Sequence, residues 1–244
     1  MILPVQGQWV KGSIIGGGME DGMASGVSHM DRVKLLSEAL LSREIQGELA
    51  VRVQSVYQAS IELKQEMVAA HAETIVRMAW VLYRCMKRGG KVLFCGAGGS
   101  AAVAQHFAAE LLGRLRPHIE RDPLPALSLV LDPSSVTAFA DGEGLAPYFE
   151  RMTRAFGRPG DVLVGLMAES SPSVVAALRV GRDTGLVTLG FLGGVADPWA
   201  VDACDIAVVS PPAVTTRTEE AHLTAGHAML ELVEDLLLDR IWGP

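Results

Sequence analysis

A glycine-rich turn followed by an alanine-rich helix carries the residues of this chain with the clearest chemical potential. The sequence Phe94-Cys95-Gly96-Ala97-Gly98-Gly99-Ser100 leads from an apolar run into a helix expected over 100–115. Backbone N–H groups at a helix N-terminus favour an anion, and glycines allow a close approach. Further along, His106 and Glu110 are four residues apart and share one helix face. The segment therefore predicts an anion site beside an imidazole–carboxylate pair.

Both features have a structural alternative. The turn could serve only the close packing of strand and helix, and the histidine and glutamate could form an ordinary surface pair. The composition of the helix argues against a surface pair, because alanines make a poor solvated face and a buried carboxylate needs a partner. These alanines are Ala101, Ala102, Ala104, Ala108 and Ala109.

The last predicted helix, 218–240, opens on a second group of polar residues. Glu219 and Glu220 suit the positive end of a helix dipole, which would account for either acid without any function. That explanation does not cover His222 and His227, which lie further along a stretch rich in leucine and alanine. Core histidines are commonly just hydrogen-bonded, so a ligand or acid–base role is one of two open alternatives. The candidate N-caps of this helix are Thr215, Thr216 and Thr218.

Together the two segments offer a set of imidazole and carboxylate ligands that suits zinc or another first-row metal. The members of the set are His106, Glu110, His227 and one of Glu219 and Glu220. Helix periodicity favours Glu220, since a spacing of seven residues places it on the stripe of His227. Glu219 would require a distorted first turn.

Short apolar runs that alternate with helical patterns predict the fold that positions these residues. Strands are expected at 92–95, 126–131, 162–166, 187–191 and 206–209, and further helices near 148–156 and 173–182. Runs that are apolar on both faces indicate an α/β fold with a doubly wound, parallel, five-stranded sheet. Ligands of such sheets bind beyond the carboxyl ends of the strands, where the glycine turn and the loop after Leu166 lie.

The region before the first strand, 31–88, shows apolar residues at steps of three and four and is expected to be helical. Two helices there would pack in an oligomer or, alternatively, simply cover the sheet. Residues 1–30 contain scattered glycine and methionine without the pattern of a signal peptide. We expect a flexible extension over 1–30 and a single domain over 31–244.

Composition narrows the class of protein. The chain has 244 residues and a formal net charge of −7, which argues against general nucleic-acid binding. No apolar run is long enough to cross a bilayer, so no membrane partner is expected. The three cysteines are far apart in sequence, which predicts reduced core cysteines in a cytoplasmic protein.

Four motifs in succession resemble the phosphoheptose isomerase family, whose members are sugar isomerase (SIS) domains. The resemblance extends from about Ile45 to Asp235. The motifs are Cys95-Gly96-Ala97-Gly98-Gly99-Ser100, Gln105-His106-Phe107-Ala108-Ala109-Glu110-Leu111, Gly157-Arg158-Pro159-Gly160-Asp161-Val162-Leu163, and Glu219-Glu220-Ala221-His222 with Gly226-His227.

The resemblance implies a homotetramer that isomerises sedoheptulose 7-phosphate to an aldoheptose 7-phosphate, with active sites between subunits and one zinc per subunit. It implies that Glu110 is the base, His227 the partner acid and Ser100 a residue at the phosphate end. The implied metal ligands are His106, Glu110, Glu219 and His227. The implied substrate-binding residues are Gly98, Gly99, Ser100, Asp132, Ser170, Ser171 and Glu219.

The chain departs from the family pattern mainly at the phosphate end. The family's Ser-Thr-Ser-Gly-Asn-Ser loop corresponds here to Met167-Ala168-Glu169-Ser170-Ser171-Pro172-Ser173, which places a negative charge near a phosphate. Glu219 stands where the family usually has glutamine, and Val214 where an aspartate is frequent. An Asn-Asp pair after the second strand is altered around Ala140-Asp141-Gly142-Glu143.

Three functions are compatible with this pattern: a phosphoheptose isomerase that grips its substrate differently, an isomerase of another sugar, and a non-catalytic SIS scaffold of the type that binds a replication initiator. The presence of Glu110 and His227 favours an enzyme, whereas the altered loop favours the other two alternatives. We expect an aldose–ketose isomerase acting on a sugar phosphate.

Overall fold

The computed structural model describes residues 28, 30–31, 43–130, 133–142, 144, 146–194 and 198–240. The chain divides into two units, 1–53 and 54–244. Nearly all of the extension expected over 1–30 lies outside the described residues. Of the helical region expected over 31–88, residues 43–87 form one continuous helix, α2 (Arg43–Lys87), whose opening turns are the main described part of the first unit.

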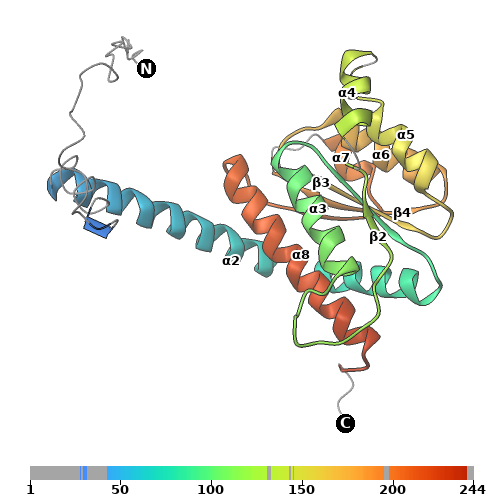
Figure 1. The fold of residues 1–244 in the computed structure, drawn as a ribbon, viewed down its shortest axis with the longest axis horizontal. Helices are drawn as coiled ribbons and strands as arrows, with labels where there is room; N and C mark the ends of the chain where they lie inside the picture. Colours follow the sequence, from blue (N-terminus) through green and yellow to red (C-terminus); the bar gives the residue numbers. More distant parts are fainter. Residues whose placement is uncertain are drawn as a thin grey trace. The chain divides into compact units, whose positions relative to one another are not determined.

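The second unit contains a five-stranded parallel sheet in the order β2-β1-β3-β4-β5, which confirms the predicted fold class (Figure 1). The strands are β1 (Val92–Gly96), β2 (Ala126–Ser128), β3 (Val162–Met167), β4 (Val187–Leu192) and β5 (Ile206–Val209). β1 pairs on one side with β2 and on the other with β3, so that Gly96 and Leu166 lie opposite each other where β1 ends.

The second strand ends earlier than the expected 126–131. The N–H of Leu129 still donates to the carbonyl of Phe94, at 2.8 Å. The carbonyl of Leu129 instead accepts from the hydroxyl of Tyr148, at 2.9 Å. The Tyr148 hydroxyl therefore takes the place of the next hydrogen bond between neighbouring strands, and β2 ends at Ser128.

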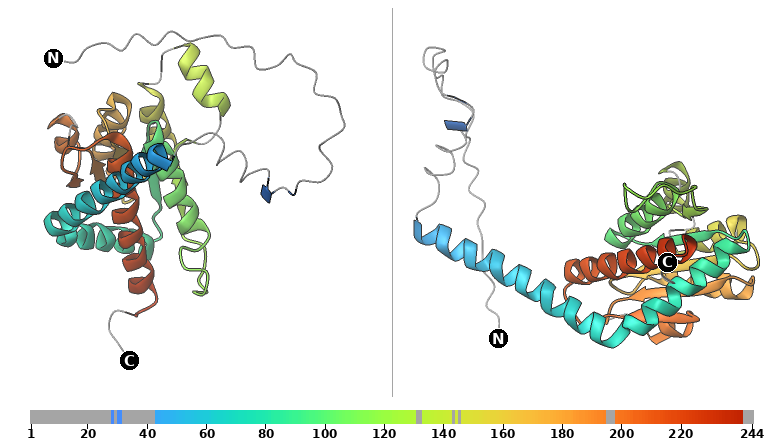
Figure 2. Two further views of the ribbon diagram at one scale, coloured as in Figure 1. Left: turned by 90° about the vertical axis from the view of Figure 1, so that its left-hand side faces the viewer. Right: turned by 90° about the horizontal axis from the view of Figure 1, so that it is seen from below.

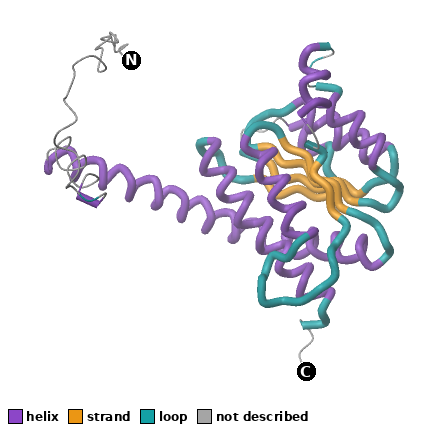
Figure 3. The backbone as a smooth tube through the Cα atoms, viewed as in Figure 1, coloured by secondary structure: helices purple, strands orange, loops and turns teal. Residues whose placement is uncertain are grey.

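Helices cover both faces of the sheet (Figures 2 and 3). Successive strand residues point to opposite faces, so Phe94 joins one core cluster while Leu93 and Cys95 join the other. The first cluster includes residues of α2, α3 (Gly99–Leu112) and α8 (Thr215–Leu237). The second includes residues of α5 (Tyr148–Phe156), α6 (Pro172–Asp183) and α7 (Pro198–Asp202).

Two short helices were not predicted, because the apolar pattern of each is too brief to show a helical period. They are α4 (Pro133–Asp141) and α7, and each begins at a proline, which suits a first helical position.

The last helix begins three residues before the expected 218. Its N-cap is Val214, whose carbonyl accepts the N–H groups of Arg217 and Thr218. The prediction of a threonine N-cap is therefore wrong. The hydroxyl of Thr215 instead donates to the carboxylate of Glu169.

The three cysteines, Cys85, Cys95 and Cys204, are free and buried, as the sequence predicts. Burial raises the pKa of the Cys85 thiol to about 11 and that of Cys204 to about 12. Within the described part of the chain, no helix has both the length and the apolar character needed to cross a membrane.

One imidazole lies in the core between α8 and the sheet. His222 is buried and packs against Phe191, with ring centroids 5.9 Å apart. Among the described residues, neither ring nitrogen of His222 has a hydrogen-bond partner of good geometry. Burial lowers the pKa of His222 to about 4, an effect partly opposed by the backbone of Leu192. A histidine in this position is held in the neutral form.

The buried His222 makes stability depend on pH. Below its ordinary pKa the unfolded chain binds a proton at this position, whereas the folded chain does so only below pH about 4. We expect the free energy of unfolding to be largest above pH 6.5 and to fall by about 3 kcal/mol on acidification to pH 4. Urea unfolding at fixed protein concentration measures this slope. An equal slope in His222→Asn would contradict the assignment.

Candidate active site

A pocket of about 230 Å³ lies beyond the carboxyl ends of β1 and β3. Its walls come from the glycine turn after β1, the loop after β3 and the first turns of α8. Asp132, the remaining predicted substrate residue, lies outside the described residues, as does Glu143 of the altered Asn-Asp pair. The predicted substrate residues that line the pocket are Gly98, Gly99, Ser100, Ser170, Ser171 and Glu219.

The pocket is built from two helix N-termini and a hydrogen bond that joins them. Gly98 caps α3 and Ser171 caps α6. The buried hydroxyl of Ser100 accepts from the N–H of Ala168 at 3.2 Å, which ties the glycine turn to the loop after β3. An anion in the pocket would therefore meet the positive ends of two helix dipoles.

Two carboxylates also face this pocket. Glu169 is exposed at the pocket wall and accepts a hydrogen bond from the hydroxyl of Thr215. The carboxylate of Glu219 lies directly over Gly99, where a Cβ atom would collide with it. Among the described residues that line the pocket there is no lysine or arginine. A phosphate here would depend on backbone and hydroxyl donors, against repulsion from two acids.

The residues predicted to act as acid and base lie where α3 and α8 touch. The Nε2 atoms of His106 and His227 are 2.7 Å apart, and Glu110 Oε1 is 3.7 Å from His106 Nε2. Gly226 makes this approach possible, because a Cβ at that position would overlap the ring of Phe107. The structure thus brings His227 of α8 to the His106–Glu110 pair of α3, from which the sequence separates it by more than 100 positions.

The surroundings of His227 favour the neutral form of its imidazole. Burial, and after it the charge that His106 would carry, lower the pKa of His227, while Glu110 and Glu231 oppose the shift. A neutral imidazole has one nitrogen that donates and one that accepts. This ring can therefore give a proton to one oxygen and take a proton from another.

The residues of this contact match zinc in their chemistry. Two imidazole nitrogens in a tetrahedral zinc site are separated by about 3.3 Å, so the facing rings would have to move apart by about half an ångström. Glu110 offers a carboxylate oxygen nearby, and Glu219 lies at the pocket. In the described ranges, no three His, Cys, Asp or Glu side chains are grouped to hold a metal. Imidazole nitrogens and carboxylate oxygens are donor types that zinc prefers, and the Nε2 atoms of His106 and His227 are the two donors that already face each other.

Glu220, which helix periodicity favours as a ligand, is engaged elsewhere. Its carboxylate accepts from the Ser60 hydroxyl of α2 at 2.6 Å and pairs with Arg217 at 2.9 Å. Glu219 is the acid that reaches the pocket. The periodicity argument fails because contacts with α2, which the sequence does not reveal, orient the first turn of α8.

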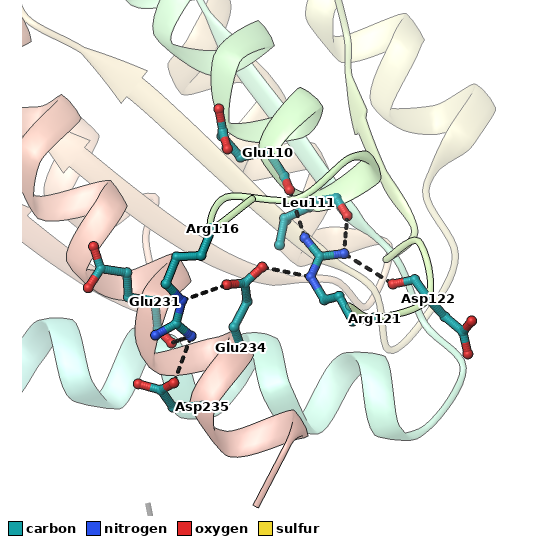
Figure 4. A network of polar contacts seen from close by, with 8 residues as sticks. All are labelled: Glu110, Leu111, Arg116, Arg121, Asp122, Glu231, Glu234 and Asp235. Carbon is teal, nitrogen blue, oxygen red and sulfur yellow. Dashed lines mark hydrogen bonds and ion pairs between the residues drawn. The ribbon is translucent and has the colours of Figure 1, made fainter. Parts of the chain in front are cut away.

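An ionic cluster behind Glu110 was not found by sequence reasoning (Figure 4). Glu234 of α8 accepts from Arg121 at 2.7 Å and from Arg116 at 2.9 Å. Arg121 also donates to the backbone carbonyls of Glu110 and Leu111, at 2.8 and 2.9 Å. The one available signal was an acid within the apolar stripe of the last helix, since a buried carboxylate requires partners.

Comparisons with known proteins identify the family of this chain. The SIS domain family model matches residues 56–193. A protein of Chlorobaculum parvum named phosphoheptose isomerase is 44% identical over 180 residues, which cover 73% of this chain and 86% of that protein. One from Aquifex aeolicus is 39% identical over 190 residues, covering 78% of this chain and 98% of the relative.

The solved structures that this chain resembles also include phosphoheptose isomerases. A phosphoheptose isomerase from Neisseria gonorrhoeae matches with a TM-score of 0.69 and 33% identity, covering 77% of this chain and 99% of that one. The Francisella tularensis enzyme matches with a TM-score of 0.71 and 27% identity, covering 76% and 98%. The chain therefore belongs to the phosphoheptose isomerase family of SIS domain proteins, which is a family of sugar-phosphate isomerases.

Proposed function

We propose that this chain converts sedoheptulose 7-phosphate into D-glycero-D-manno-heptose 7-phosphate. The observation that carries the proposal is the meeting of Glu110, His106 and His227 at the contact of α3 and α8. A carboxylate and a neutral imidazole supply the base and the acid that an aldose–ketose isomerisation needs. We infer the substrate from the relatives, which are named phosphoheptose isomerases. A non-catalytic scaffold is not favoured, because these relatives are named as isomerases.

In this reaction Glu110 takes a proton from C1 of the ketose, and the electrons of that C–H bond form the C1–C2 double bond of an enediol. His227 gives a proton to the oxygen on C2 as the carbonyl opens, and then takes the proton from the oxygen on C1. Glu110 returns its proton to C2, and the aldehyde forms at C1. No atom is gained or lost, so an acid and a base are sufficient.

We also propose one zinc per subunit, held by His106 and His227 with Glu110 and Glu219. When bound, zinc would polarise the sugar oxygens. Support comes from the two imidazole nitrogens, which already face each other across the helix contact.

We further propose a homotetramer. The exposed side of α2 carries large apolar side chains, and an apolar groove of about 530 Å³ lies between α2 and α8. Exposed apolar surface of this kind marks a protein contact. The exposed large apolar side chains of α2 after residue 54 are Tyr57, Ile61, Val68, Val76 and Trp80.

The base is tested by Glu110→Gln, which keeps the shape of the side chain and removes its basicity. We expect kcat to fall by about 10²- to 10⁴-fold while the oligomer stays intact. Aldose formation measures turnover, and size-exclusion chromatography measures assembly. Glu150→Gln, on the surface of α5, is the control for loss of one negative charge. Turnover of Glu110→Gln at the rate of the unmodified chain would contradict the mechanism.

The phosphate end is tested at Glu169. Met167 and Ala168 are buried, so the exposed Glu169 is the residue of the altered loop that can be changed without disturbing the core. We expect Glu169→Gln to lower KM for the sugar phosphate at least severalfold, because it removes a repelling charge. The same change should leave KM less dependent on salt. An unchanged KM would place the phosphate elsewhere, and Glu150→Gln again serves as the control.

The metal is tested by zinc titration of protein stripped with a chelator. We expect one equivalent of zinc per chain and, in His106→Ala, a fall in affinity of at least tenfold. Isothermal titration calorimetry measures both without any need for turnover. Equal binding by the two proteins would contradict the assignment of His106. Stripped chain that takes up no zinc would contradict the metal proposal as a whole.

A further inference from the structure

The guanidinium of Arg121 lies directly behind the catalytic helix. It donates to the carbonyls of Glu110 and Leu111, which belong to the last turn of α3 and have no partner within that helix. A cation at this end also complements the negative end of the helix dipole. In Figure 4 the carbonyl of Glu110 faces Arg121, while its carboxylate points away. Arg121 therefore holds the backbone of the base and leaves its carboxylate free.

Arg121 is itself fixed from α8. Its Nε donates to Glu234 Oε1 at 2.7 Å, and the side chains of Arg121 and Glu234 are only 4% and 1% exposed. Glu234 follows His227 by seven residues, so both lie on one stripe of α8. A buried carboxylate that lost this cation would be strongly destabilised, which keeps the pair together.

We propose that Arg121, held by Glu234, is a positioning residue of the proton-transfer site. It joins the end of α3 that carries Glu110 to the helix that carries His227, and so it sets the separation of base and acid. The inference rests on the proposed function, since it assigns a role within that same site. A displacement of about 1 Å in a catalytic group can cost about 100-fold in rate.

The chain supplies a matched control in Arg116. This side chain shares the Glu234 carboxylate, pairs with Asp235 at 2.6 Å and reaches the carbonyl of Glu231 at 3.4 Å. In the part of the chain that the structure describes, none of the side-chain hydrogen bonds of Arg116 goes to α3. Loss of Arg116 therefore weakens the same cluster without releasing the backbone of Glu110.

The experiment compares Arg121→Gln, Arg121→Lys and Arg116→Gln with the unmodified chain. For each, kcat, KM and Tm are measured, and amide hydrogen exchange is followed over residues 106–112. We expect Arg121→Gln to lower kcat about tenfold to a hundredfold with KM within about threefold. Arg121→Lys, which keeps the charge but not the planar fork, should recover part of the rate. Arg116→Gln should lower Tm while kcat stays within about twofold.

Exchange over residues 106–112 should rise in Arg121→Gln and not in Arg116→Gln. Equal losses of kcat in Arg121→Gln and Arg116→Gln would overturn the proposal, because they would show a merely structural role. So would an unchanged kcat in Arg121→Gln. If Arg121→Gln does not fold, Arg121→Lys decides: unchanged kcat and exchange overturn the proposal. If the unmodified chain does not turn over the substrate, the proposed function fails, and the exchange comparison still decides whether Arg121 positions this helix end.

Discussion

The close contact between α3 and α8 is the constraint on which the candidate site depends. It exists because Gly226 has no side chain, so that the ring of Phe107 can lie against the backbone of α8. A helix pair that approaches so closely brings His106 and His227 within hydrogen-bond distance. Any larger residue at 226 would separate the two imidazoles, and with them the acid from the base.

The same pair of helices is joined a second time, further along, by charge. Arg121 and Glu234 are buried together, and the guanidinium also satisfies two carbonyls at the end of α3. A glycine contact alone would leave the helices free to pivot about Phe107. Two points of attachment fix their relative orientation, and proton transfer requires such a fixed geometry between a base and an acid.

Much of the fold could be predicted from the sequence because the sheet is buried on both faces. β3 is a continuous apolar run, β4 is interrupted only by the buried Thr188, and both strands were predicted within one residue of their ends. The end of β2 depends on a hydroxyl of Tyr148, which is 19 residues away, and this was not predictable. The short helix α4 carries too few apolar positions to show a period.

The candidate site likewise combines features set by neighbouring residues in the sequence with features set by contacts between distant residues. Gly98, Gly99 and Ser100 are adjacent in sequence, and their turn was predictable from local chemistry. The choice between Glu219 and Glu220 was not, because Ser60, 160 residues away, decides which acid is free. Arg121 and Glu234 are 113 residues apart in the sequence. The one sequence signal of their contact was an acid within the apolar stripe of the last helix.

The pocket beyond the carboxyl ends of β1 and β3 combines opposing electrostatic features. Two helix N-termini and a serine-bearing turn favour an anion, whereas Glu169 and Glu219 oppose it. The local electrostatics therefore predict weaker binding of a phosphate than the backbone alone would give. The proposed base Glu110 and its neighbour His106 lie further along α3 from this pocket, with His106 about 9 Å beyond Ser100. Glu219 belongs both to this pocket and to the proposed zinc ligands, so the two parts of the proposed site share one residue.

The most direct measurement is turnover of sedoheptulose 7-phosphate by the purified, zinc-loaded chain, followed as formation of the aldose. We expect a rate above about one per second at saturating substrate, which is ordinary for an enzyme. Absence of turnover in protein that is folded and carries zinc would contradict the proposed function. That result would leave an isomerase of another sugar or a non-catalytic SIS protein as the remaining alternatives.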